Sequence, residues 1–253
     1  MIKIENYEVL GWEHAIRGMR NPMNSWDKSD SSFKATAKTI CMEDGQLKDY
    51  YVRYDALGIG ENDHELMMKL RNAGTDHRKF MRMIDVYVDI TAPLYWWKEF
   101  DTYKVGTVAN SCSTMHKIHD KKFTLDDFSC EHLITGFEEP VTECSICLIP
   151  ESESCYCDYD LDCHPKDILC YTVKMLNKCR EKFLETKDKK YWWQMIQLLP
   201  SSYNQKRTVM LNYEVLANIY KSRKNHKLDE WRDFCKWIES LPYSELITGG
   251  KEE

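Results

Sequence analysis

Residues 82–104 read "RMIDVYVDITAPLYWWKEFDTYK", and this stretch says most about the fold. Apolar side chains recur at every second position from Ile84 to Ile90, with mostly polar residues between them. This period of two predicts a half-buried strand over 82–93. Pro93 suits the first turn of a helix, so a helix is expected over 94–104. We expect the helical structure to end in residues 105–115.

Outward from this stretch, helical patterns dominate. A strand is expected at 34–42. In 62–74 the apolar spacing predicts a helix that Asn62 or Asp63 caps and Gly74 ends. Further helices are predicted over 7–20, 165–187, 189–199, 203–223 and 228–241. The expected class is therefore α/β (α+β) with a helical C-terminal half, and we predict one domain over residues 1–253.

Composition limits the function classes. The chain has 253 residues, 43% hydrophobic and 30% charged, with a net charge of −6. Sequence-independent nucleic-acid binding needs a basic surface, so we expect no nucleic-acid partner. No stretch reaches the roughly 20 apolar residues that span a bilayer, and the N-terminus lacks a signal-peptide pattern. We therefore expect a cytoplasmic protein without a membrane partner, its cysteines mostly reduced.

Residues 137–166 form an acidic, Cys-rich insertion. Cys144 and Cys147 have C-x-x-C spacing, Cys155 and Cys157 follow, and Cys163-His164 closes the segment. Thiolates and imidazole at such spacing can hold zinc. The spacing is irregular, so a reduced loop with incidental cysteines is the alternative.

In this stretch a strand is followed by Ala92-Pro93, then by an aromatic helix, and then by a segment rich in Ser, Thr and Asn. This order resembles that of the flavin-dependent thymidylate synthases. Their signature R-H-R-x7-S falls here on Thr102, Tyr103 and Lys104, of which only Lys104 is basic. With one residue inserted, the family Ser aligns with Ser113, and the Asn before it with Asn110. The closing Arg of the signature is Met115.

Two segments nearer the N-terminus also resemble the family. His77 follows the helix at 62–74, where the family has the first His of a turn. "HAIRGMRNP" resembles the family's N-terminal helix, with Arg17 and Arg20 at matching places and Pro22 where the family has Ser.

The C-terminal half resembles the family without a gap. After Leu199-Pro200 the motif places Asn212, then Asn218, then Arg223. Glu214 stands where the family has Arg, a reversal of charge, and the family's closing Ala-Gln-x-Glu is absent.

The resemblance implies a homotetramer that binds FAD and turns dUMP into dTMP, with NADPH as reductant and methylenetetrahydrofolate as carbon donor. It implies an antiparallel sheet flanked by helices. It assigns Ser113, Arg223 and Lys104 to the nucleotide, and His77, Tyr103, Lys104, Asn110, Asn212 and Asn218 to the cofactor.

Other interpretations stay open. Trp96 and Trp97 are interpreted as packing residues rather than flavin platforms, because buried aromatics mostly pack. Lys104 and Arg223 also suit the C-terminal ends of helices, whose dipoles favour cations. The chain is either a divergent enzyme of this kind, a non-catalytic nucleotide- or partner-binding descendant, or an interaction protein with a zinc-binding Cys-rich loop. Lys98, Lys206 and Arg207 are candidates to replace the lost cations.

Overall fold

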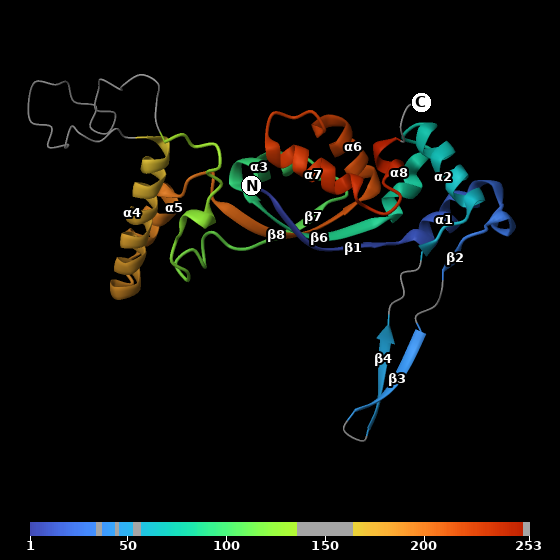
Figure 1. Ribbon diagram of the computed structural model, residues 1–253, viewed down its shortest axis with the longest axis horizontal. Coiled ribbons are helices and arrows are strands. Elements are labelled where there is room, and N and C mark those ends of the chain that lie inside the picture. Colours follow the sequence, from blue (N-terminus) through green and yellow to red (C-terminus); the bar gives the residue numbers. More distant parts are fainter. Residues whose placement is uncertain (34–36, 44–45, 53–56, 136–163, 250–253) are drawn as a thin grey trace, which may run out of the picture. The chain divides into compact units, whose positions relative to one another are not determined.

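The structure is a computed structural model (Figure 1). It describes residues 1–33, 37–43, 46–52, 57–135 and 164–249. These residues fall into two compact units. Unit 1 comprises 1–3, 90–102 and 110–208, and unit 2 comprises 4–89, 103–109 and 209–253.

The central element is an antiparallel four-stranded sheet. Its strand order is β1-β6-β8-β7, formed by Lys3–Leu10, Asp85–Pro93, Asn204–Asn212 and Val108–Ser111. Short antiparallel pairs join β2 (Ser32–Phe33) to β5 (Leu57–Gly58), and β3 (Ala37–Glu43) to β4 (Gln46–Val52).

Helices make up most of the rest. The α-helices are α1 Trp12–Arg20, α2 Glu61–Asn72, α3 Leu94–Phe100, α4 Pro165–Thr186, α5 Lys189–Leu198, α6 Tyr213–Arg223, α7 Asp229–Glu239 and α8 Glu245–Thr248. The 3₁₀ turns are η1 Asn21–Met23, η2 Trp26–Lys28, η3 Arg78–Met83 and η4 Leu125–Asp127.

Strand β6 confirms the strand predicted over 82–93, although it begins only at Asp85, because residues 82 and 83 belong to η3. Ile84, Val86 and Ile90 are fully buried, whereas Tyr87 on the opposite face is exposed. The aromatic helix after it also packs as expected, because Trp96 and Trp97 are both 0% exposed. That helix ends at Phe100, earlier than predicted.

Two predicted helices were wrong in part. Residues 204–212 form β8, because Gln205, Val209 and Leu211 are buried at a strand's period of two, while α6 begins only at Tyr213. The N-terminal helix begins at Trp12 rather than at residue 7. Gly11 ends β1 with φ +94°, and a Cβ there would lie 1.9 Å from the Met83 carbonyl oxygen, so the turn requires glycine.

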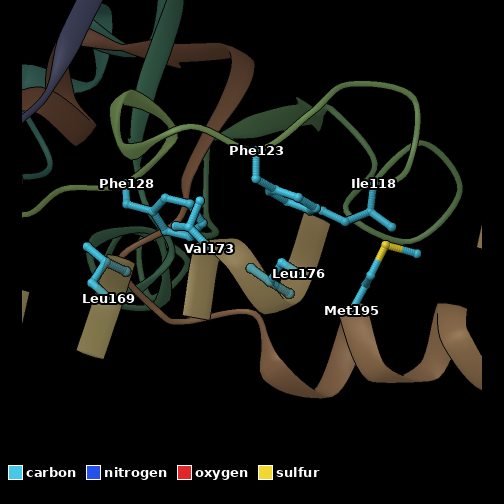
Figure 2. Close-up of a cluster of buried hydrophobic side chains, with 7 residues drawn as sticks. All are labelled: Ile118, Phe123, Phe128, Leu169, Val173, Leu176 and Met195. Atoms are coloured by element: carbon cyan, nitrogen blue, oxygen red, sulfur yellow. The ribbon is translucent and has the colours of Figure 1, made fainter. Parts of the chain in front are cut away.

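Unit 1 has its own apolar core around α4 and α5 (Figure 2). Leu169, Val173 and Leu176 bury one face of α4, whereas the neighbouring Ile168 is 52% exposed. Asn177 fastens this helix to the preceding loop through both backbone groups of Phe123, each at 2.9 Å.

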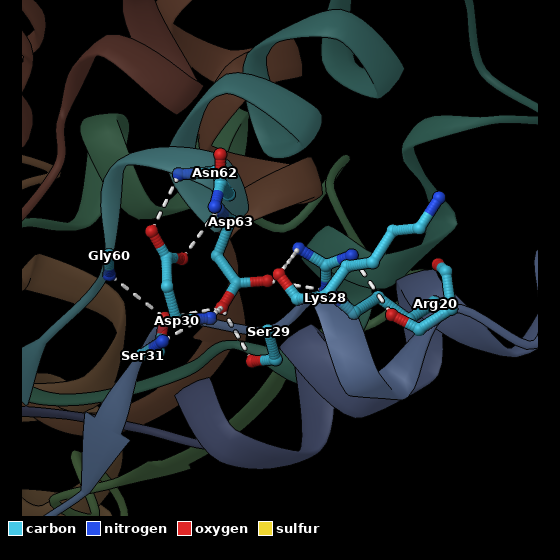
Figure 3. A network of polar contacts seen from close by, with 9 residues as sticks. Arg20, Lys28, Ser29, Asp30, Ser31, Gly60, Asn62 and Asp63 are labelled. Atoms are coloured by element: carbon cyan, nitrogen blue, oxygen red, sulfur yellow. Dashed lines mark hydrogen bonds and ion pairs between the residues drawn. The ribbon is translucent and has the colours of Figure 1, made fainter.

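Unit 2 is organised around a buried ion pair (Figure 3). Arg20 Nε donates to Asp63 Oδ1 at 2.6 Å, and the two side chains are 4% and 0% exposed. The other Asp63 oxygen accepts from the hydroxyls of Ser29 and Ser31, each at 2.6 Å, and from backbone amides. Arg20 Nη1 and Nη2 also donate to the carbonyls of Ser25 and Lys28, each at 3.1 Å, so the buried Arg20 anchors the 21–31 loop.

The start of α2 differs from the prediction for the same reason. Asp63 faces this network, and Gly60 occupies the cap position. Asp30 instead accepts from the backbone amides of Asn62, at 2.9 Å, and Asp63, at 3.1 Å. Neither Asn62 nor Asp63 is therefore the cap. Gly74 follows the helix with φ +110°, as a helix-ending glycine should.

Candidate functional site

A cationic and aromatic cluster lies where the loop at 103–107 meets α6 and α7, within unit 2. Arg223 Nε donates to the Tyr103 hydroxyl at 2.9 Å. The Arg223 guanidinium lies 4.7 Å from the ring centroid of Trp231 and 5.7 Å from that of Tyr103. Trp231 is fully buried, so it forms a fixed platform that holds Arg223 in place.

The same loop approaches the N-terminus of α6. Gly106 has φ +78°, and a Cβ there would lie 2.9 Å from Asn212 Nδ2 and 3.2 Å from Val215. Asn212 Oδ1 caps α6 by accepting from the Val215 amide at 3.1 Å. The glycine thus lets the loop run along α6 from Asn212 towards Arg223, and Lys104, on this loop, is exposed.

One buried polar atom of this loop lacks a hydrogen-bond partner among the described residues. Thr107 Oγ1 is buried and has no hydrogen-bond partner within the described part of the chain. Buried hydroxyls are nearly always satisfied, so an orphaned one is a feature that a bound group can complete.

The partners of Glu214 explain why an acidic residue can stand where the family has Arg. Its buried carboxylate pairs with Arg82 and accepts from Arg78 Nε at 3.4 Å. Arg78 Nη2 also donates to Asn218 Oδ1 at 3.1 Å. The hydrogen bond to Glu214 raises the pKa of Arg82 above its ordinary value. Two guanidinium groups from η3 meet one carboxylate, so this group keeps a net charge of +1, the charge of the single Arg that the family has at position 214.

The two groups lie on different sides of α6. Asn218 and Arg223 are five residues apart, about 140° around a helix of 3.6 residues per turn. Asn218 therefore belongs with Arg78, whereas Arg223 belongs with Tyr103 and Trp231. His77 directly precedes η3 on an exposed turn, next to the arginine that binds Asn218.

Asn110 and Ser113 belong to unit 1. Asn110 is exposed on β7. Ser113 Oγ accepts from the amides of Met115, at 3.2 Å, and His116, at 2.9 Å, so the hydroxyl holds a local turn and keeps its own proton for donation. The structure therefore brings Tyr103 and Arg223 together, with Lys104 exposed at the next position after Tyr103, and holds Asn218 beside Arg78.

The predicted zinc ligands Cys144, Cys147, Cys155 and Cys157 lie outside the described residues. Within the described ranges, no group of three or more His, Cys, Asp or Glu side chains is arranged to hold a metal ion.

The sequence did not point to Trp231, Arg78 or Arg82 as site residues. Trp231 lies in an ordinary amphipathic helix, and no local pattern separates it from a core tryptophan. For the two arginines a signal existed, because a buried Glu on α6 requires a cation.

Comparisons by sequence find no relative, since no protein-family model and no curated protein matches the chain. Among solved structures, it is similar to the flavin-dependent thymidylate synthase ThyX from Helicobacter pylori complexed with FAD and dUMP. The TM-score is 0.59 at 15% identity, over 98% of both chains. A second structure of that protein with FAD and dUMP gives 0.60 at 15% identity, over 100% of this chain and 99% of the other.

A third similar structure is the UMP/dUMP methylase PolB from Streptomyces cacaoi bound with 5-Br dUMP. Its TM-score is 0.53 at 11% identity, over 98% of this chain and 95% of that one. These matches confirm the predicted fold class, a flavin-dependent thymidylate synthase-like fold, over nearly the whole chain. No described helix has the length and apolar character needed to cross a membrane.

Proposed function

We propose that this chain is a divergent FAD-dependent thymidylate synthase or a related pyrimidine-nucleotide methylating enzyme. The order of the family-like motifs supports this proposal. So does the fold shared with two structures that contain FAD and dUMP and with a third that contains 5-Br dUMP. On this proposal dUMP becomes dTMP, with methylenetetrahydrofolate as carbon donor and NADPH as reductant, in a homotetramer.

The observation that carries the proposal is the Arg223–Tyr103–Trp231 cluster beside Lys104. An arginine fork fixed by aromatic rings suits a phosphate or a pyrimidine edge, because its donors are oriented before the ligand arrives. FAD has a planar ring system and phosphate groups, and both suit a site that combines cations with flat aromatic faces.

The residues present fit a phosphate-bearing cofactor. The orphaned hydroxyl of Thr107 offers an unused donor and acceptor, and Lys104 offers an exposed ammonium group. FAD, when bound, supplies two-electron redox chemistry that no side chain provides. His77, Asn110, Asn212 and Asn218 complete the proposed cofactor residues, and Ser113 is proposed for the nucleotide.

The chain's own contribution is binding and orientation. Lys104 attracts a phosphate as a point charge, and Arg223 holds Tyr103 so that the phenol proton is available to the ligand. Placing the reacting groups in this way lowers the entropic part of the barrier.

The test is product formation. Purified protein with FAD, dUMP, NADPH and methylenetetrahydrofolate should form dTMP, and each omission should abolish it. Arg223→Gln should lower the rate at least about tenfold, which corresponds to a lost charged hydrogen bond. A protein that dUMP stabilises against heat without forming dTMP would instead be a non-catalytic nucleotide binder, a reading that the uncharged Thr102 of the signature favours.

A further inference from the structure

Arg207 on β8 is a half-buried cation of unit 1 that its neighbours hold in place. Its guanidinium carbon lies 4.2 Å from the ring centroid of Trp97, and the Arg207 side chain is 15% exposed. Trp97 is fully buried, and its indole N–H donates to the Gln205 carbonyl at 2.9 Å. The platform under Arg207 therefore cannot move.

The hydrogen bonds of Arg207 fix the rest of its geometry. Nε donates to Gln205 Oε1 at 3.0 Å, and Nη1 donates to Asp101 Oδ1 at 2.7 Å. Gln205 is itself held, because its Nε2 donates to the Cys112 carbonyl at 2.7 Å. These bonds stop the guanidinium from rotating about its own axis.

The fork is nevertheless only partly used. A guanidinium has five N–H donors, and two of them form bonds with the described residues. Both hydrogens on Nη2 and the second on Nη1 have no partner in the part of the chain that the structure describes. This end of the fork is the one that binds two phosphate oxygens side by side.

The charge of Arg207 is only weakly offset. Its ion-pair partner Asp101 is 48% exposed, and water screens such pairs strongly. Cys112 N–H donates to the Lys206 carbonyl at 2.9 Å, so the segment that holds Asn110 and Ser113 is hydrogen-bonded to the strand that carries Arg207. Thr102, next to Asp101, cannot supply a cation, and its hydroxyl donates to the Glu99 carbonyl at 2.7 Å.

We propose that Arg207 binds the phosphate of the nucleoside monophosphate and so takes the place of the cation missing at Thr102. This inference rests on the proposed function and adds a specificity-determining residue to it. The ligand class is a phosphate monoester, recognised through the remaining donors on Nη1 and Nη2, while Trp97 covers one face of the guanidinium and Gln205 and Asp101 hold Nε and Nη1.

The experiment compares binding of dUMP and deoxyuridine to the full chain by isothermal titration calorimetry. Arg207→Gln should weaken dUMP binding about tenfold or more and leave deoxyuridine unchanged, because only dUMP carries the phosphate. Arg207→Lys keeps a charge over Trp97 and should give an intermediate loss. Adding Thr102→Arg to Arg207→Gln should restore much of the affinity.

Asp101→Asn is the matched control. It removes the charge of the ion pair but keeps the guanidinium and an oxygen acceptor for Nη1, so dUMP should lose much less affinity than in Arg207→Gln. A loss in Asp101→Asn equal to that in Arg207→Gln, without rescue by Thr102→Arg, would mean that the ion pair is only structural and overturn the inference. So would dUMP affinity within about twofold of wild type in Arg207→Gln. If the wild type itself does not bind dUMP, the proposed function fails and this inference fails with it.

Discussion

Replacing Asp63 with asparagine should strongly destabilise unit 2. The carboxylate pairs with buried Arg20 and accepts from Ser29, Ser31 and two backbone amides. Asparagine keeps the shape but removes the charge and turns one acceptor into a donor. Breaking one side of a buried ion pair costs about 3–5 kcal/mol, because the remaining charge stays buried without compensation.

That loss corresponds to a fall in Tm of about 6–20 °C, at about 2–4 °C per kcal/mol for a chain of this size. Thermal unfolding followed by circular dichroism measures it. Glu185→Gln is the matched control, since its ion pair with Lys182 is solvent-exposed, and it should leave Tm unchanged. A Tm for Asp63→Asn within about 2 °C of wild type would refute the reasoning.

The same residue sets a dependence on pH. Burial by itself raises the pKa of Asp63, but hydrogen bonds from Ser29, Ser31 and Arg20 outweigh it and hold that pKa below 3.8. The resulting stabilisation is complete above the unfolded-state pKa and is lost as pH falls through the folded-state pKa. Wild type should therefore lose more stability than Asp63→Asn as the pH is lowered below about 4.

Three further outcomes are expected. Tyr103→Phe should weaken nucleotide or flavin binding about tenfold, because it removes one hydrogen bond to the charged Arg223. Calorimetry measures this, and an unchanged Kd would contradict the role of the phenol. Gly106→Ala should lower the free energy of unfolding by about 1–2 kcal/mol in urea titrations, since φ is +78° and the new methyl group meets Asn212; no loss would show that the loop relaxes freely. Iodoacetamide at pH 8 should label exposed Cys112 much faster than Cys235, because burial and the nearby Glu239 raise the pKa of the Cys235 thiol to about 11. Peptide mass spectrometry measures the two labelling rates, and equal rates would be inconsistent with the burial of Cys235.

The predictable parts of the fold were those in which the apolar residues recur with a single period. In β6 the apolar residues alternate without interruption, and α4 has a long helical stripe between Pro165 and Lys187. Strand β8 was missed because Gln205 occupies an inward position where an apolar residue is expected, and Lys206 and Arg207 hide the alternation around it.

The site was only partly predictable because its contacts are distant in sequence. The resemblance pointed to Tyr103 and Arg223 separately, but no local pattern shows that residues 120 apart share a hydrogen bond. Glu214 was misleading for the same reason, since its partners Arg78 and Arg82 lie more than 130 positions earlier. Side-chain pairing across such distances is set by tertiary packing rather than by local propensity.

The central claim is that this fold still binds flavin with fewer signature cations. Its most direct test is the visible absorbance spectrum of the purified protein before and after FAD is added and the excess removed. We predict flavin absorbance that stays with the protein and that weakens in a Tyr103→Phe, Lys104→Gln double variant. A protein that remains colourless at saturating FAD, while correctly folded by circular dichroism, would contradict the claim.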